Sequence, residues 1–297
     1  MKLVYRSFCA AALGLPLLLA GCSLFPTTRH LPAPRPATVN SATPQELVNQ
    51  INQTWDALNS LTATVEIQAT EYKTAEGVQT VEDFPSCHAN ILMRKPKMLR
   101  VRGTYFGVLA FDMASDGSNF TLLDPHDNTV FEGPNTVKEK STNALLNLRP
   151  DFFLDAIAVR GLDHGNEYMV ENDSETIEDP ARKHLYIEQE YTLSVMQPKA
   201  GPEKLPLRVI TFHRDDMLPY DQDVYDSEGN LESQITYRDY AEFGKVKYPT
   251  KVTIKRPQEG FQLVLTVDDV HQNIDPGLSD SQFEVKIPEG TKIQQLK

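Results

Sequence analysis

The residues with the chemistry for catalysis or metal binding are spread thinly along this sequence. No two of its seven histidines have the spacing that places two ligands on one helix face, and no cysteine completes a metal motif with them. A zinc site needs three or four convergent ligands, so we expect no metal ion and no other cofactor. The histidines are His30, His88, His126, His164, His184, His213 and His271.

Two of these histidines have acidic neighbours, as catalytic acid–base pairs often do. Asp215 and Asp216 follow His213, and Asp268-Asp269 precedes His271. We expect both groups at strand ends or turns, where exposed aspartate is ordinary. The sequence has no nucleophile-elbow motif, phosphate-binding loop or dinucleotide fingerprint. We therefore predict no catalytic residues and no enzymatic activity. A hydrolase of envelope components is the least supported alternative, because catalytic groups need not be neighbours in sequence.

The first 21 residues have the three parts of a secretory signal. Lys2 and Arg6 make the start positive, and the uncharged stretch 8–20 is short for a membrane span of roughly 20 residues. That stretch ends in Leu19-Ala20-Gly21-Cys22, which resembles the lipobox of bacterial lipoproteins. The resemblance implies removal of residues 1–21 and acylation of Cys22, with an ordinary secretory signal as the alternative.

Attachment through acyl chains has a simple energetic basis. Each buried methylene contributes about 0.8 kcal/mol, so two or more chains hold a protein firmly on a membrane. In the lipoprotein pattern, a serine such as Ser23 after the cysteine implies the outer membrane, with the protein facing the periplasm. The inner membrane is the alternative.

Charge and cysteine content narrow the possible partners. The formal net charge is −12, and loss of Lys2 and Arg6 with the signal gives −12 − 2 = −14. Such a surface repels nucleic acid, so we expect no nucleic-acid partner. Cys9 lies in the signal and Cys22 is the expected acylation site, which leaves Cys87 without a disulfide partner. We expect Cys87 to be a small core residue, and a reactive thiol is the alternative.

The remaining chain divides into a tether and a body. Residues 22–42 contain four prolines among small polar residues, the composition of an extended tether. The body, 43–297, opens with Thr43-Pro44-Gln45-Glu46, which predicts a helix with a capping box and a proline in its first turn. A second amphipathic helix is predicted within 143–159, starting near Pro150.

Elsewhere the apolar pattern has a period of two, which predicts roughly ten or more short antiparallel strands. Turn residues such as Asp116-Gly117 and Asp124-Pro125 separate them. The predicted fold class is mainly β with two helices: a curled antiparallel sheet that forms an incomplete barrel, covered by an N-terminal and a central helix. The space between sheet and helices is either a filled core or an apolar cavity.

The order and spacing of several segments are typical of a known family. The first helix runs into Ser60-Leu61-Thr62-Ala63-Thr64-Val65, and the segment 91–100 has an apolar strand, a basic pair, a proline and the next strand. Ser115-Asp116-Gly117 then precedes Leu122-Leu123-Asp124-Pro125, and residues 244–255 and 283–288 close the pattern. Over approximately residues 43–290 the chain resembles the Lol-type outer-membrane lipoprotein carriers and receptors. Residues 171–180 and 199–206 look like insertions.

That resemblance implies binding of acyl chains or a lipidated peptide between sheet and lid. It also implies a lid-tether role for the basic residue before the strand proline, here Lys95. A lysine lacks the bidentate contact of arginine, and an exposed surface lysine is the alternative. For the candidate cavity and lid residues the alternative is ordinary core packing. These residues are Trp55, Leu58, Val101, Tyr105, Phe111, Leu122, Phe152, Phe153 and Ile157.

Two functional interpretations follow. The first is a membrane-anchored envelope lipoprotein that holds acyl chains or lipidated peptide in an apolar cavity and serves lipid or lipoprotein localisation. A lipidated chain is more similar to the membrane-bound receptors than to the soluble carrier, so a shuttle between membranes is not expected. The second is a non-catalytic assembly lipoprotein with a filled core, whose partner is another envelope protein.

Overall fold

The computed structural model describes residues 39–75, 78–135, 150–179, 184–197, 204–274 and 277–296, and the backbone of 35–36. The expected signal, Cys22 and most of the expected tether lie outside the described residues. Contacts divide the chain into two units, 1–36 with 176–187, and 37–175 with 188–297. In the first unit, β1 (Arg35–Pro36) pairs in parallel with Tyr186 and Ile187. The residues of the pockets and side-chain clusters described below all lie in the second unit.

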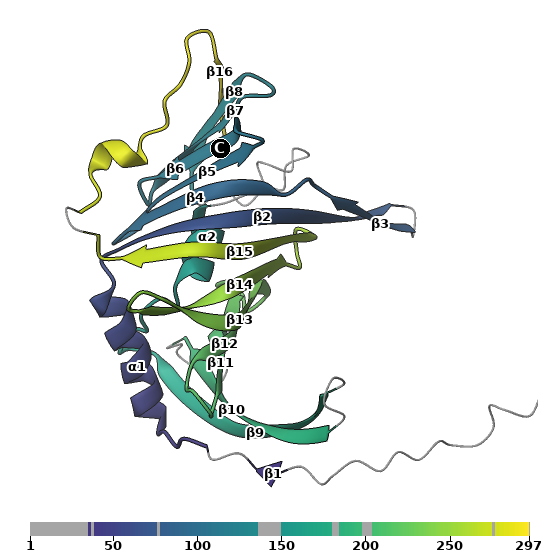
Figure 1. The fold of residues 1–297 in the computed structure, drawn as a ribbon, viewed down its shortest axis with the longest axis vertical. Coiled ribbons are helices and arrows are strands. Elements are labelled where there is room, and N and C mark those ends of the chain that lie inside the picture. Colours follow the sequence, from purple (N-terminus) through teal and green to yellow (C-terminus); the bar gives the residue numbers. More distant parts are fainter. Residues whose placement is uncertain are drawn as a thin grey trace, which may run out of the picture. The chain divides into compact units, whose positions relative to one another are not determined.

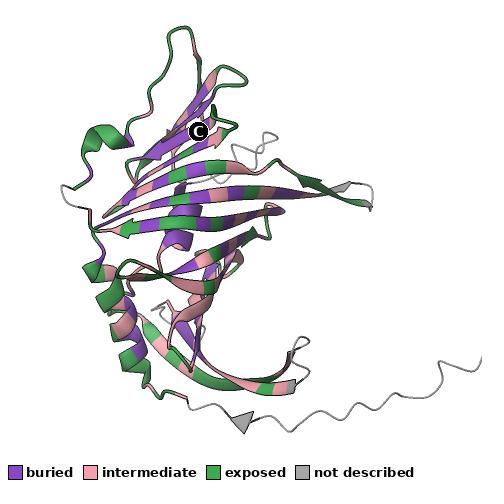
Figure 2. Ribbon diagram, in the orientation of Figure 1, coloured by how far each residue is buried: buried purple, intermediate pink, exposed green. Residues whose placement is uncertain are grey.

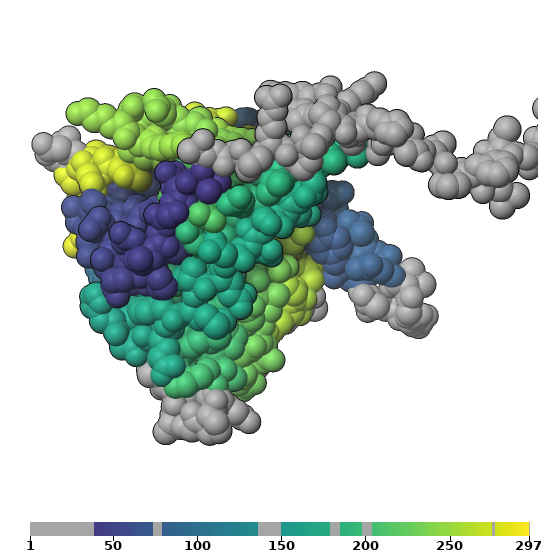
Figure 3. All heavy atoms as spheres, turned by 90° about the horizontal axis from the view of Figure 1, so that it is seen from below, coloured from purple at the N-terminus to yellow at the C-terminus, as the bar shows by residue number. Residues whose placement is uncertain are grey.

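The N-terminal helix α1 (Pro44–Ala57) begins where its capping residues predict. The Glu46 backbone N–H donates to Thr43 Oγ1 at 3.3 Å, and the Thr43 N–H donates to the Glu46 carboxylate at 2.7 Å. These two bonds satisfy donors that a helix start otherwise leaves unpaired. The apolar face of α1 is buried against the sheet residues Tyr191, Leu193, Ile210 and Phe212. Figure 3 shows α1, in dark purple, beside the teal and green strands.

One sheet dominates the described residues, and its neighbouring strands are almost all antiparallel (Figure 1). Its order is β10-β11-β12-β13-β14-β15-β2-β4-β5-β6-β7-β8-β16, with β3 beside β2 and β9 beside β10. The strands are β2 (Ser60–Ala75), β3 (Val78–Asp83), β4 (Cys87–Arg94), β5 (Met98–Tyr105), β6 (Val108–Ser115), β7 (Asn119–Asp124), β8 (Thr129–Pro134), β9 (Glu167–Asp179), β10 (His184–Met196), β11 (Pro206–His213), β12 (Pro219–Tyr225), β13 (Leu231–Phe243), β14 (Val246–Arg256), β15 (Phe261–Gln272) and β16 (Lys292–Gln295).

The sheet is curled and open, so it confirms the predicted fold class. Its first and last halves meet through β2, which pairs with β15 on one side and with β4 on the other. Residues of β2 alternate between buried and more exposed positions, as strand geometry requires, and Figure 2 shows the same banding on β4 and β15. Leu61, Val65 and Ile67 are among the buried residues that face the concave side.

The second helix, α2 (Pro150–Ile157), packs on this concave side, and Phe153 and Ala156 are fully buried there. Carbonyl groups at its C-terminal end need partners from outside the helix. The Tyr248 hydroxyl donates to the Ile157 carbonyl at 2.6 Å, and the Gln222 side chain donates to the Asp155 carbonyl at 3.1 Å. Residues 143–149 of the predicted helical region lie outside the described residues.

The C-terminal segment lies on the opposite, convex face. Its short 3-10 helix η3 (Asp280–Phe283) contacts β5, and β16 pairs in parallel with β8. Arg100 donates to both oxygens of Asp112, at 2.9 and 2.7 Å, and also to the Gln282 carbonyl. Residues 171–179, taken as part of an insertion, belong to strand β9. Within the described residues, no helix has the length and apolarity needed to cross a membrane.

Candidate functional site

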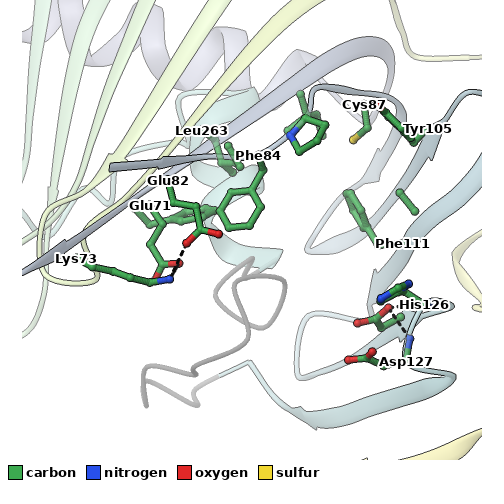
Figure 4. A pocket seen from close by; sticks show the side chains of 16 residues that line it. Glu71, Lys73, Glu82, Phe84, Cys87, Tyr105, Phe111, His126, Asp127 and Leu263 are labelled. Atoms are coloured by element: carbon green, nitrogen blue, oxygen red, sulfur yellow. Dashed lines mark hydrogen bonds and ion pairs between the residues drawn. The ribbon is translucent and has the colours of Figure 1, made fainter. Parts of the chain in front are cut away.

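A pocket of about 660 Å³ opens on the concave face of the sheet, beside the β2–β3 hairpin (Figure 4). Cavities of this size suit small ligands, whose sites span roughly 300–1,000 Å³. Among the described residues, the lining comes from strands and their connections and includes neither helix. The lining residues are Ile67, Ala69, Glu71, Lys73, Glu82, Phe84, Pro85, Cys87, Tyr105, Ala110, Phe111, Asp124, His126, Asp127, Phe261 and Leu263.

The floor of the pocket is apolar because the rows of apolar side chains on the concave faces of β2, β6 and β15 extend from the core to the pocket. On β2 the buried alternation reaches Ile67 and Ala69, and Ala69 pairs with Leu263 of β15. Phe111 of β6 lies across Gly103 of β5, its pairing partner. A Cβ atom on Gly103 would lie 2.4 Å from the Phe111 ring, so only glycine lets the ring occupy this position.

One side of the pocket carries an ion cluster, which we call the Glu71–Lys73–Glu82 cluster. Lys73 Nζ lies 3.2 Å from Glu71 Oε2 and 2.8 Å from Glu82 Oε2. The Glu71 side chain is 4% exposed, whereas those of Lys73 and Glu82 are about half exposed. Hydrogen bonds to Glu82 and Glu71 raise the pKa of Lys73, so the lysine stays charged and paired.

The other side carries the turn between β7 and β8 (Figure 4). The buried Asp124 carboxylate accepts backbone N–H bonds from His126 and Asp127, at 3.0 and 3.3 Å. Asp124 therefore fixes the turn, as aspartate commonly does, and the exposed Asp127 adds a further acidic group.

Cys87 begins strand β4 and forms part of the pocket wall, where it is half-buried and not, as expected, within the core. Burial and the charge of Glu66 raise the pKa of the thiol, so it stays protonated. A protonated, half-buried thiol behaves as a small apolar group. It adds to the apolar lining rather than acting as a nucleophile.

An apolar hairpin tip lies beside the pocket. Tyr105, which lines the pocket, is 45% exposed, and Phe106 and Val108 beyond it are 88% and 70% exposed. The rings of Tyr105 and Phe106 pack edge to face at 4.6 Å. Phe106 has a φ of 47°, a conformation that large side chains seldom adopt. The turn thus directs a phenylalanine into solvent.

No protein-family model matches the sequence, and a comparison with curated proteins gives no match. Among solved structures, a DUF1329-family protein from Desulfovibrio piger is similar with 14% identity and a TM-score of 0.48, over 81% of this chain and 95% of the other. A LolA-superfamily protein from Nitrosomonas europaea has 13% identity and a TM-score of 0.48, over 82% and 99%. A domain from Vibrio parahaemolyticus, described as an outer-membrane lipoprotein-sorting protein, has 13% identity and a TM-score of 0.46, over 80% and 94%.

The residues proposed from the sequence for a cavity or lid fall into three groups. Tyr105 and Phe111 line the large pocket. Trp55, Leu58 and Ile157 line a second cavity of about 140 Å³, between α1, the chain after α2, and strands β13 and β14. Val101, Leu122 and Phe153 are buried in the core, and Phe152 lies beneath the Arg256 guanidinium at 3.6 Å.

Lys95, the lid-tether candidate, lies against the first helix. Its Nζ is 4.6 Å from the centre of the Trp55 ring, a cation–π contact that joins the start of the β4–β5 turn to α1. Such contacts contribute about 0.5–1 kcal/mol at exposed sites. The helix near the concave face, α2, instead has Arg256 over Phe152.

Sequence reasoning did not find the Glu71–Lys73–Glu82 cluster. Its signal is that the inner-face positions of β2 change from apolar residues to Glu71 and Lys73. Glu82 comes from β3, which was not predicted.

Of the two histidines with acidic neighbours in the sequence, His271 contacts such a neighbour and His213 contacts other carboxylates. His271 Nε2 lies 2.9 Å from Asp269, and both side chains are exposed. His213 is buried and instead contacts Glu188 and Glu190 of β10, at 3.2 and 3.5 Å. Ligand atoms of these three side chains lie within 4.8 Å of one another. Each carboxylate lies near a different ring nitrogen of His213.

Proposed function

We propose that this protein is a lipid-anchored envelope protein that binds acyl chains, of a lipid or a lipidated peptide, in the pocket on its concave face. The observation that carries the proposal is the 660 Å³ pocket, whose floor of Ile67, Ala69, Phe111 and Leu263 is an extension of the core. Burying apolar surface yields about 25 cal/mol per Å². An acyl chain on this floor therefore gains free energy without any directional contact.

The hairpin tip supports a pocket that works close to a membrane. Phe106 and Val108 lose unfavourable contact with water when they enter a lipid interface, and Tyr105 suits a boundary that is wet on one side. Attachment through Cys22, as the lipobox resemblance implies, would keep the body near the outer membrane. We infer a role in lipid or lipoprotein localisation.

The same tip favours one second candidate function. Exposed aromatic residues are also typical of protein interfaces, so an assembly lipoprotein that docks on another envelope protein through Phe106 is the alternative. That function needs no occupant in the pocket. Occupancy of the pocket therefore distinguishes the two.

A matched pair of substitutions on β2 tests the proposal. Ala69 lines the pocket, whereas its neighbour Gln68 is exposed on the convex side. Ala69→Phe should place a ring over the apolar floor of the pocket and weaken binding of a fluorescent alkyl-chain probe by about tenfold or more, equivalent to 1.4 kcal/mol. Gln68→Phe should leave binding within about twofold. Equal affinities for the two variants, or a wild-type protein that binds no chain, would overturn the proposal.

A further inference from the structure

We propose that the pocket selects amphiphiles with a positively charged head, such as an alkylammonium group, over amphiphiles of equal chain length with an anionic head. This inference rests on the proposed function, because it names the ligand class of the same pocket. It comes from the charges along the rim rather than from the apolar floor.

The ionisable residues of the lining are strongly unbalanced. Among the described lining residues there are four carboxylates, those of Glu71, Glu82, Asp124 and Asp127, and one ammonium group, that of Lys73. For these five groups the sum is 1 − 4 = −3. The carboxylates lie on two sides of the pocket: Figure 4 shows Glu71 and Glu82 on one side and Asp127 on the other. A concave site lined by one sign of charge attracts ligands of the other sign.

The Glu71–Lys73–Glu82 cluster supplies the contact point. One lysine is shared by two carboxylates, and each carboxylate contacts it through one of its two oxygens, the atom named Oε2. Among the described residues, Oε1 of Glu71 and Oε1 of Glu82 make no hydrogen bond or ion pair. These oxygens are available to accept N–H bonds from an ammonium head, and charge-assisted bonds of this kind are the strong ones.

The burial of Glu71 strengthens this preference. Its carboxylate lies beside the apolar Phe261, its pairing partner on β15, and a charge in such surroundings needs compensation. Charges interact more strongly there than in water because the local dielectric is lower. A second cation on Glu71 and Glu82 would complete the compensation that Lys73 alone begins.

Lys73 does not offer a site to an anionic head. It is already engaged by two carboxylates, and those bonds raise its pKa, so an anion would have to displace Glu71 or Glu82 to reach it. Displacing Glu71 would leave a buried carboxylate without its partner. Asp124 and Asp127 on the other side would repel the same anion.

Three amphiphiles with the same alkyl chain and different head groups separate the effect of the head group on affinity from that of the chain. Dodecylammonium, dodecyl maltoside and dodecanoate carry positive, neutral and negative heads, and each would compete against the fluorescent chain probe below its micelle-forming concentration, at about pH 7.5, where carboxylates are ionised. We expect dodecylammonium to bind about tenfold more tightly than dodecanoate at low salt, with the neutral head between them. The difference should shrink as salt is added.

Substitutions on and off the pocket assign the preference to its rim. Glu82→Gln removes one of the two carboxylates at an exposed position, so it should fold normally, and Glu71→Gln removes the buried one. Each should reduce the preference for dodecylammonium to about threefold or less. Glu66→Gln, on the same strand but facing the convex side, is the matched control and should keep the full preference.

The outcomes keep the two proposals distinct. Equal binding of all three heads, or tighter binding of dodecanoate, would overturn the head preference while leaving chain binding intact. A preference that survives both glutamine substitutions would also overturn it, because the charge responsible would lie elsewhere. Binding of none of the three would contradict the proposed function itself.

Discussion

At the scale of single residues, Gly103 sets the width of the pocket. Phe111 lies over it so closely that any side chain on residue 103 would collide with the ring. This part of the floor that a chain would contact is therefore the Phe111 ring itself, which lies against Gly103 of β5. Replacing a large core residue by a small one leaves a cavity. Here the small native residue Gly103 leaves space that the Phe111 ring occupies.

Gly103→Ala should force the Phe111 ring toward the pocket. Overpacking of this kind costs about 1–3 kcal/mol, which urea unfolding would report as a lower midpoint, and alkyl-chain probes should bind more weakly. Adding Phe111→Leu to Gly103→Ala should restore much of both, because the smaller side chain removes the collision. If Gly103→Ala alone binds the probe as wild type does, Phe111 does not form the floor as described.

Single residues also show what the sequence can and cannot predict. Thr43 and Glu46 identified the start of α1 because capping is a local interaction. Tyr105 and Phe111 were identified as inner-face candidates by alternation, and both line the large pocket. Glu71 was missed, because a glutamate on a strand reads as exposed until the pairing of β2 with β15 is known.

At the scale of elements, the β5–β6 hairpin carries an apolar tip that packing among the described residues does not explain. Its connection, Phe106-Gly107, has positive φ values that suit a tight turn, which glycine or asparagine would adopt more easily than phenylalanine. An aromatic residue that is 88% exposed in such a turn contributes little to the stability of the fold. It suits contact with a surface outside the molecule.

In protein that carries no acyl chain on Cys22, Phe106→Ser should weaken binding to phospholipid vesicles without lowering the stability of the fold. Loss of an aromatic side chain from a lipid interface costs roughly 1.5–3 kcal/mol if it is fully buried there, so co-sedimentation with vesicles should fall about tenfold or more. Val81→Ser, at another exposed apolar position on β3, provides a control that should change little. Vesicle binding that is the same for Phe106→Ser and wild type would favour a protein partner for the tip.

The sequence predicts some of the strands but not the way in which they come together at the pocket. Strand periodicity predicted the fold class, since strands such as β5 and β13 have clear alternation. It did not predict β3 or the length of β9, both of which are rich in charged and polar residues. The pocket depends on β2, β6 and β15 lying near one another, and that register follows from long-range pairing, which a single sequence does not reveal.

At the scale of the described sheet, the apolar concave face is continuous from the core to the pocket. Helix α2 covers its central part, and no described helix covers the part at the pocket. Phe153, Ala156 and Ile157 of α2 fill the central part, where the remaining cavity against α1 is about 140 Å³. Toward the β2–β3 hairpin no described helix lines the concave side, and the space there is about 660 Å³. We propose that this second region takes an acyl chain.

The dependence of binding on the length of the alkyl chain tests this proposal. Titration of the full protein with alkyl ligands that share one head and differ only in chain length should give dissociation constants that fall about fourfold per methylene, as roughly 0.8 kcal/mol per buried CH₂ requires. The trend should level off once the pocket is full, and it should be absent in Ala69→Phe. Dissociation constants that do not depend on chain length, or a trend that Ala69→Phe leaves unchanged, would contradict the claim.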